Sequence, residues 1–398
     1  MNDDIYWIWL LKCFGSAAAI DDIIRYFGSA RGLYEAGSTE WRLSGLLTAK
    51  QIAALSKWSP SQSGDVLKAC RENDWEILTP QSIYYPQRLR EIRNFPPVLF
   101  LKGDKEVLLR DVKLSIVGTR RASNYGLRVA RLLAEALSEA GAVVVSGGAL
   151  GVDSAAHAGA LHAHGKTIAV LGCGLGTDYL RENADLRKEI SRNGALISEF
   201  LPFSPASRTT FPLRNRIISA LSLGTVVVEA GEKSGSLITA RLALEQGRDV
   251  FAVPGDIVSS AFTGANKLIH DGAKPVFTPL DILEEYVYTY PEEINTVHAD
   301  RTLGEMLRHG EQSAPHRFSA QVGTAKTAVP NTARPHVPLP ESATGTAQSV
   351  YAALDTARHI DELSEKTGLP VSACLSALTE LELYGCVRLT EGKKYEKV

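Results

Sequence analysis

Between residues 113 and 283 the sequence alternates short apolar segments with longer segments of helical periodicity. The clearest helix follows the first apolar segment: its apolar residues recur with a three- and four-residue spacing from Val129 to Ala140, and Gly141 ends it. Nearly continuous apolar strands with helices between them form a parallel sheet that is covered on both faces. The alternation therefore predicts an α/β fold with strands at residues 114–117, 142–145, 167–171, 195–198, 225–228 and 249–253.

The segments before and after this domain differ from it in composition. Residues 1–75 have helical periodicity broken by Gly–Ser pairs, which predicts a small helical module that is either a packing module or a set of helix-hairpin-helix turns able to hold a DNA phosphate. Residues 76–110 are punctuated by prolines and are expected to form an extended lead-in to the core at 111–290. Residues 291–346 turn into a Pro-, Thr-, Ala- and Ser-rich mixture, which is typical of a flexible linker.

Residues 347–398 regain a compact pattern. Three expected helices, at 349–354, 360–366 and 371–384, precede a short expected hairpin, and this order predicts a winged-helix domain. The third helix is poor in Lys and Arg and contains Glu380 and Glu382, so a protein contact is an alternative to binding in a DNA groove.

Composition limits where a polyanion could bind. The 398 residues carry a formal net charge of −2, so a nucleic-acid site has to be a local basic patch. The five cysteines are far apart and form no CxxC pair, which favours a reducing compartment. The N-terminus lacks the basic and small-residue features of a signal peptide, and no apolar run approaches the roughly 20 residues that span a bilayer. We expect a cytoplasmic protein without a membrane span.

Small or polar residues follow every expected strand. The carboxyl ends of parallel strands meet at one edge of the sheet, and ligands of open α/β sheets bind there. Beside this edge, residues 211–222 (FPLRNRIISALS) place Arg214, Asn215 and Arg216 at an expected helix start, where the helix dipole favours an anion. Phe211 adds an aromatic ring, and a structural arginine network around a core phenylalanine is the alternative interpretation.

Further basic residues extend the patch along the same edge. Arg120 and Arg121 follow the first strand, and Lys233 precedes an expected helix at 237–245. A phosphate-binding groove beside a stacking ring suits single-stranded nucleic acid better than duplex, because stacking needs exposed bases. The candidate DNA-binding residues are Arg120, Arg121, Ser146, Gly147, Gly148, Arg208, Phe211, Arg214, Asn215, Lys233, Ser234 and Gly235. Arg208 and Phe211 are expected to face the ligand, Arg214 to serve either the ligand or Glu229, and Arg216 to be structural.

Other chemical motifs do not match. The sequence GKT at 165–167 leads into a strand, whereas a P-loop follows one, and the glycines at 147–151 and 172–176 lack the dinucleotide-binding spacing. His157, His162 and His164 have no nearby Cys or paired acid, so solvated or packing histidines are favoured over a metal site. We expect neither a cofactor nor a metal. Glu229 ends a strand and is either a general acid or base or the partner of an arginine such as Arg214.

Five ordered segments together resemble the DNA-processing protein A family (DprA/Smf). They are SIVGTRRASNYG at 115–126, SGGALGVD at 146–153, FPLRNRIISALS at 211–222, EAGEKSGSLITARLA with GRDVFAVPG at 229–255, and GANKLIHDG at 264–272. The resemblance implies an extended Rossmann-like core with an N-terminal helical module of the SAM or helix-hairpin-helix type and a C-terminal winged helix. It also implies a cytosolic homodimer that binds single-stranded DNA, protects incoming strands in natural transformation, and loads the recombinase RecA onto strands covered by single-strand-binding protein. By similarity, Arg120 or Arg121, Arg208, Phe211 and Lys233 would contact DNA.

An enzyme is the alternative to this non-catalytic role. Nucleotide-processing enzymes of a related Rossmann-like superfamily cleave sugar–base or sugar–phosphate bonds with an arginine and a glutamate on the same edge, here Arg214 and Glu229. This sequence keeps only Gly224-Thr225 of the Pro-Gly-Gly-x-Gly-Thr motif that precedes the glutamate in one such group. A transcription factor acting through the winged helix is a third possibility, and it predicts duplex binding by residues 345–398 alone.

Overall fold

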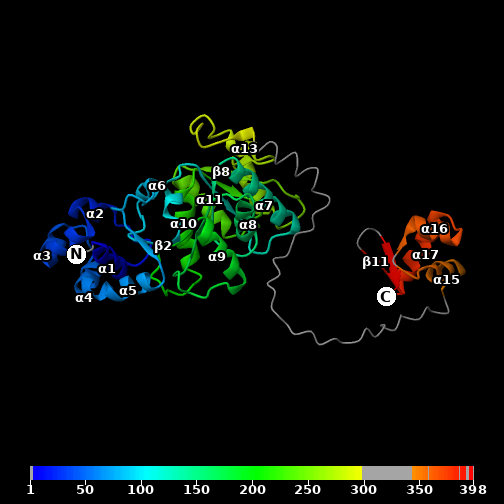
Figure 1. Cartoon of the computed structure of the whole chain (residues 1–398), viewed down its shortest axis with the longest axis horizontal. Helices are drawn as coiled ribbons and strands as arrows, with labels where there is room; N and C mark the ends of the chain where they lie inside the picture. The colour runs from blue at the N-terminus through cyan, green and yellow to red at the C-terminus, as the bar shows by residue number, and fades with distance from the viewer. Residues whose placement is uncertain (1–2, 298–342, 357, 385, 391–393, 398) are drawn as a thin grey trace. The chain divides into compact units, whose positions relative to one another are not determined.

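The computed structural model describes residues 3–297, 343–356, 358–384, 386–390 and 394–397, which fall into two compact units (Figure 1). The first unit, within residues 1–317, holds the N-terminal helices and the α/β domain, and the second, within 318–398, holds the C-terminal helices and strands. Most of the predicted linker at 291–346 lies outside the described residues. Its last residues are helical rather than linker, because α15 already begins at Gly345.

A nine-stranded sheet organises the described part of the first unit. Its order is β1-β2-β6-β5-β4-β3-β7-β8-β9, and the seven strands from β6 to β9 are parallel. All six predicted strands are confirmed, with ends that shift by one residue at most. Their bounds are β3 Lys113–Val117, β4 Val143–Ser146, β5 Thr167–Val170, β6 Ala195–Ser198, β7 Gly224–Val227 and β8 Asp249–Ala252.

Three further strands were not predicted. β1 (Glu76–Leu78) and β2 (Leu99–Gly103) belong to the segment expected to be an extended lead-in, and β2 pairs antiparallel with β6. The expectation that residues 76–110 lie outside the sheet domain was therefore wrong. β2 begins after Pro96-Pro97, and its first three side chains are completely buried. This segment also contains α6 (Gln87–Arg90), and the short β9 (Lys274–Pro275) ends the sheet beyond β8.

Helices cover both faces of the sheet (Figure 1). Alternate strand residues such as Leu114 and Ile116 pack with α7, α8 and α13, whereas Val117 and Val145 pack in the core that includes α10 and α11. This alternation is what a sheet buried on both sides requires. No helix in the described ranges has the length and apolarity to cross a bilayer. The helix bounds are α7 Asn124–Glu139, α8 Val152–His162, α9 Ala184–Asn193, α10 Thr210–Leu221, α11 Ser236–Glu245, α12 Thr263–His270 and α13 Leu280–Leu283.

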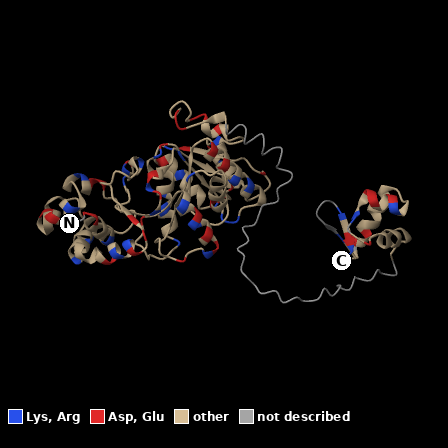
Figure 2. Cartoon of the chain, in the orientation of Figure 1, with Lys and Arg blue, Asp and Glu red and all other residues tan. Residues whose placement is uncertain are grey.

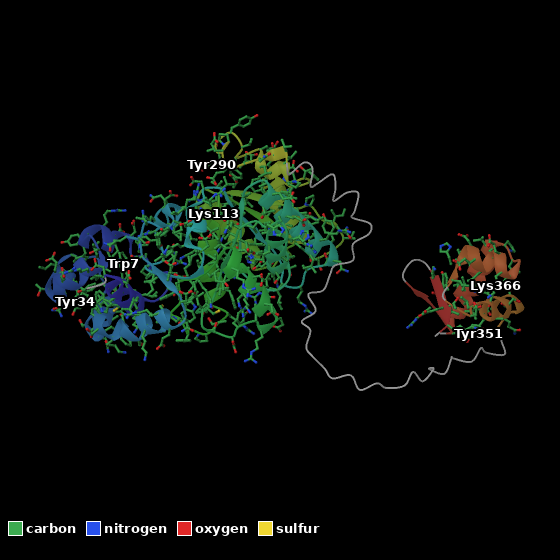
Figure 3. The ribbon with its side chains drawn as sticks, in the orientation of Figure 1. Trp7, Tyr34, Lys113, Tyr290, Tyr351 and Lys366 are labelled. Carbon is green, nitrogen blue, oxygen red and sulfur yellow. The ribbon has the colours of Figure 1, made fainter. Side chains whose placement is uncertain are left out.

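The N-terminal module is helical, as predicted. Its core is built on tryptophans: Trp7 lies among the helices in Figure 3, and the buried Trp9 donates its indole N–H to the Trp58 carbonyl at 2.7 Å. That bond satisfies the one polar atom of a large buried ring. The helices are α1 Asp4–Phe14, α2 Asp21–Phe27, α3 Ala30–Leu43, α4 Ala49–Lys57 and α5 Gly64–Glu72.

The second unit contains the three helices and hairpin of a winged helix. Tyr351, labelled in Figure 3, lies on its first helix, and Lys397 on its last strand places its Nζ 4.3 Å from the centre of the Tyr351 ring. The third helix, α17, has no Lys or Arg, in keeping with the sequence analysis. Its exposed residues include the apolar Val371 and Leu375. The bounds are α15 Gly345–Ala353, β10 Arg358–His359, α16 Ile360–Thr367, α17 Val371–Leu383, β11 Val387–Thr390 and β12 Lys394–Lys397.

His157 on α8 is completely buried against the sheet. Its Nδ1 lies 2.7 Å from the hydroxyl of Thr167, and that hydroxyl donates to the Val144 carbonyl at 2.7 Å. Because the single hydroxyl proton is used there, Nδ1 of His157 carries the proton and donates. Nε2 has no partner among the described residues, and burial lowers the pKa of His157 to about 3. The packing interpretation of this histidine is confirmed.

This burial predicts a pH-dependent stability. Between pH 6.5 and pH 3 the unfolded chain binds a proton at residue 157 that the folded chain does not, so stability falls as the pH falls. Between pH 6.0 and pH 4.5 the parent should lose about 2 kcal/mol more stability than His157→Leu, measured by urea unfolding at each pH. His162→Gln is the control, since His162 is exposed. Equal pH slopes for the parent and His157→Leu would contradict this account.

Candidate nucleic-acid interface

The strand order reverses between β3 and β7, and a crevice lies there. The chain runs outward from β3 through β4, β5 and β6 on one side and through β7 and β8 on the other, which makes the β3–β7 boundary the topological switch point of the sheet. The loops after β3 and β7 and the first turns of α10 line the crevice. The residues that matter for its chemistry are Thr119, Arg120, Arg121, Asp153, Phe211, Arg214, Asn215, Ser234 and Gly235.

Some exposed cations line this crevice, and others are close in the sequence to residues that line it. Arg121 follows β3, Arg208 precedes α10, and Lys233 precedes α11; all three are exposed. Within the described part of the chain, their side chains form no hydrogen bond or ion pair, so they are available to an anion.

Arg120 and Phe211 are in direct contact. The Arg120 guanidinium carbon lies 4.5 Å from the centre of the Phe211 ring, and Nη1 of Arg120 lies 3.4 Å from the hydroxyl of Tyr179. The Tyr179 ring lies 5.3 Å from that of Phe211, at an angle of 43°. The predicted ring and the predicted arginine are thus brought together, along with a second aromatic ring that the sequence motifs did not indicate.

Arg214 is placed differently from the expectation. Its side chain is 4% exposed, and Nη1 donates to the carbonyls of Gly147 and Val170, at the ends of β4 and β5. Burial lowers the pKa of Arg214 to about 10, and Asp153 opposes this shift; the group stays protonated at neutral pH. Arg214 therefore forms part of the crevice floor and is not a free phosphate ligand. Its neighbour Asn215 is also buried and accepts a hydrogen bond from Nε of Arg214 at 3.1 Å.

Three other candidates are buried and were wrongly assigned to direct contact. The Ser146 hydroxyl is fully buried and donates to the Ile116 carbonyl at 2.7 Å. Gly147 lies against Arg214, and Gly148 adopts a positive φ of 65° while its carbonyl accepts from Asn183. These residues shape the turn after β4, because a left-handed backbone and close packing both favour glycine there.

Arg216 forms a buried ion pair, which supports its predicted structural role. Its two terminal nitrogens donate to the two carboxylate oxygens of Glu199 at 2.7 and 2.6 Å, and Nε donates to the Asn94 carbonyl. Arg216 is 3% exposed and Glu199 is fully buried. The pair fastens α10 to the end of β6, and the Asn94 bond fastens it to the segment before β2.

Glu229 partners a serine rather than an arginine. Its carboxylate accepts from the backbone N–H of Ser123 at 3.1 Å and from the Ser123 hydroxyl at 2.6 Å, and Ser123 caps the start of α7. The Glu229 carbonyl accepts from the N–H of Thr119. The expectation that Glu229 orients Arg214 was wrong, because Glu229 instead holds both ends of the loop that carries Arg120 and Arg121. Both residues of the alternative enzyme site therefore have structural partners.

The start of α11 agrees with the prediction that residues 233–235 precede a helix. α11 begins at Ser236, and the Ser234 and Ser236 hydroxyls bond at 2.8 Å. Gly235 is exposed, and a Cβ added to it would have no atom within 4 Å, so a side chain fits there. Ser234, Gly235 and Ser236 line the crevice, and the first backbone N–H groups of α11 donate within this turn, to the Ser234 hydroxyl and to the carbonyls of Ser234 and Gly235.

The surface charge is mixed rather than uniformly basic. Figure 2 shows Lys and Arg interspersed with Asp and Glu across the α/β domain, which is consistent with a net charge of −2. Any attraction for a polyanion therefore depends on the local set of exposed cations. Within the described ranges, no three His, Cys, Asp or Glu side chains gather in an arrangement suited to a metal ion.

Comparison with known proteins identifies the family. The family model of DNA recombination-mediator protein A matches residues 76–287, and the DprA winged helix domain matches residues 334–393. The chain belongs to the DprA/Smf family. The match begins at β1, which agrees with the assignment of residues 76–110 to the sheet domain.

Individual relatives show how far the similarity extends. The DNA processing protein DprA of Bacillus subtilis is 44% identical over 220 residues, 55% of this chain and 74% of that protein. Protein Smf of Escherichia coli is 36% identical over 317 residues, 79% of this chain and 76% of that protein. The crystal structure of DprA from Streptococcus pneumoniae superposes with a TM-score of 0.62 at 33% identity, covering 71% of this chain and 97% of that one. The chain is thus a DNA-processing protein of a recombination family.

The Arg216–Glu199 pair should be essential for stability. Glu199→Ala leaves a buried guanidinium without its carboxylate, and we expect a loss of about 3–5 kcal/mol in the free energy of unfolding, measured with urea. The control is Glu189→Ala, which breaks the exposed pair with Arg192 and should cost at most about 1 kcal/mol. Similar losses in the two variants would show that the buried pair is not an anchor.

Replacement by alanine should affect stability to different extents at two glycines of the interface. A Cβ at Gly147 would lie 2.6 Å from Nη2 of Arg214 and 2.7 Å from Oδ2 of Asp153, whereas one at Gly235 meets nothing within 4 Å. Gly147→Ala should therefore destabilise by about 1–3 kcal/mol, and Gly235→Ala by less than about 1 kcal/mol. Thermal and urea unfolding measure both, and a neutral Gly147→Ala would mean that the floor of the crevice can move freely.

Proposed function

We propose that this protein binds single-stranded DNA along the crevice edge and acts as a non-catalytic mediator that loads RecA in natural transformation. The observation that carries the binding role is the contact of Arg120 with the Phe211 and Tyr179 rings at a crevice that the exposed Arg121 also lines. The exposed Arg208 and Lys233 lie close in the sequence to crevice residues. Cations neutralise phosphates whatever the sequence, and aromatic rings stack on any base. This combination suits a strand whose bases are exposed.

The burial of Arg214 and Arg216 sharpens the proposal. Both guanidinium groups have carbonyl or carboxylate partners, so the phosphate contacts are assigned to Arg120, Arg121, Arg208 and Lys233. The proposed role places the protein in the cytoplasm, where it would act as a homodimer and protect incoming strands. Its proposed partners are RecA and strands covered by single-strand-binding protein. Family membership supports this wider role.

A salt titration of full-length protein tests the binding site. Arg208→Ala and Lys233→Ala should each weaken binding to all single strands alike and reduce the slope of log K against log salt by about 0.7. Arg192→Ala is the matched control, since this exposed arginine lies at the end of α9 that leads into the amino end of β6, the edge opposite the crevice. Fluorescence anisotropy with a labelled oligonucleotide gives both quantities.

Several outcomes would contradict the proposal. If duplex of equal length binds as tightly as the single strand, the stacking rings do not contribute. If Arg192→Ala lowers the slope as much as Arg208→Ala, the attraction comes from overall charge and not from this site. RecA loading requires a separate assay, in which the protein should increase strand exchange by RecA on DNA already covered by single-strand-binding protein.

A further inference from the structure

The Phe211 ring is in contact with three neighbours in this structure. The Arg120 guanidinium lies over it, with its carbon 4.5 Å from the ring centre. Gly172 packs against another part of the ring, because a Cβ on that glycine would lie 2.7 Å from Cδ1 of Phe211. Tyr179 occupies a third position at 5.3 Å. A base that stacks where the Arg120 guanidinium lies over the Phe211 ring therefore has to displace Arg120.

Arg120 is the neighbour that moves most easily. It is exposed, and its hydrogen bond to the Tyr179 hydroxyl is long, at 3.4 Å. The guanidinium is planar and stacks on an aromatic face, so it occupies the position that a base would take. The contact with Gly172 involves backbone and is part of the folded sheet edge. Exchange of Arg120 for a base is thus the smallest change that opens the ring.

Tyr179 is held in place through its backbone. Nη1 of Arg187 donates to the carbonyls of Tyr179 at 2.6 Å and of Leu180 at 3.1 Å. Leu180 has a φ of 53°, a left-handed conformation that a branched side chain rarely adopts without support. Arg187 is thus a positioning residue for the Tyr179 ring. The ring hydroxyl itself bonds to Arg120, and that bond is lost when Arg120 leaves.

We propose that Tyr179 and Phe211 form a two-ring platform for the bases of a single strand, and that Arg120 covers this platform until a strand binds. On binding, the guanidinium leaves the Phe211 ring and pairs with a phosphate, and bases stack on the outer faces of the two rings. The rings contact each other, so no base inserts between them. The inference rests on the proposed single-strand binding and adds Tyr179, Arg187 and the exchange at Arg120.

Substitutions at Tyr179 test the platform in the full-length protein. Tyr179→Leu keeps an apolar side chain over the underlying pocket but removes the ring, and it should weaken single-strand binding about 10-fold without changing the salt slope. Tyr179→Phe keeps the ring and loses only the long hydrogen bond to Arg120, so it should bind at least as tightly as the parent. A strand containing 2-aminopurine should show fluorescence quenching with the parent and with Tyr179→Phe, and less with Tyr179→Leu.

The variant Arg187→Met tests whether Arg187 positions the Tyr179 ring. It should reduce the quenching while the salt slope stays at the parent value, because no phosphate contact is removed. Thermal unfolding of each variant establishes that it is folded. Parent-like affinity and quenching in folded Tyr179→Leu would overturn the platform, as would a Tyr179→Phe variant as weak as Tyr179→Leu.

An oligonucleotide with an uncharged methylphosphonate backbone tests the exchange at Arg120. With no phosphate charge to attract the guanidinium, Arg120→Ala should bind this probe about 2- to 5-fold more tightly than the parent, since nothing has to leave the ring. Arg121→Ala, which removes a neighbouring exposed charge, should bind the probe as the parent does. Unchanged or weaker binding by Arg120→Ala would overturn the exchange.

The results also separate this inference from the proposed function. If the parent binds ordinary single strands and Arg208→Ala weakens binding while Tyr179→Leu does not, the two-ring platform is wrong and single-strand binding stands. If the parent binds no single strand at all, the proposed function fails first.

Discussion

Two buried arginines on α10 hold this helix against the carboxyl edge of the sheet. Arg214 donates to the carbonyls that end β4 and β5, and Arg216 pairs with Glu199 at the end of β6. Removing two guanidinium groups from water costs several kcal/mol each unless all their donors find partners. The helix can therefore take few other positions, and the two buried arginines thereby fix the position of Phe211 in its first turn.

The interface thus divides its charged residues between two roles. Buried groups position the loops and α10, as Glu229 does for the turn between β3 and α7. Exposed cations such as Arg121, Arg208 and Lys233 form no side-chain hydrogen bond or ion pair within the described residues. In a chain with a net charge of −2, any local attraction for a polyanion has to come from exposed cations such as Arg121 that have no partner among the described residues.

The strongest sequence signals predicted the fold well. The prediction of six strands with helices between them was correct, because a strand buried on both faces appears in the sequence as a nearly continuous apolar run. The short β1 and the proline-preceded β2 were missed because neither has that pattern. Within the site, exposed cations were predictable from residue type and position in the chain. Three features of the site could not be predicted from the sequence, because each depends on which distant loops the sheet brings together. They are the burial of Arg214, the partner of Glu229 and the placement of Tyr179.

The antiparallel pairing of β2 with β6 has a consequence for the edge of the sheet. Without β2, the backbone N–H and C=O groups along one side of β6 would face solvent beside fully buried residues such as Ala195 and Ile197. A free, apolar edge strand readily pairs with a strand of another molecule. The segment preceding the parallel strands therefore covers this edge of β6 against pairing with a strand of another molecule, and a fragment beginning at residue 105 would lose that cover.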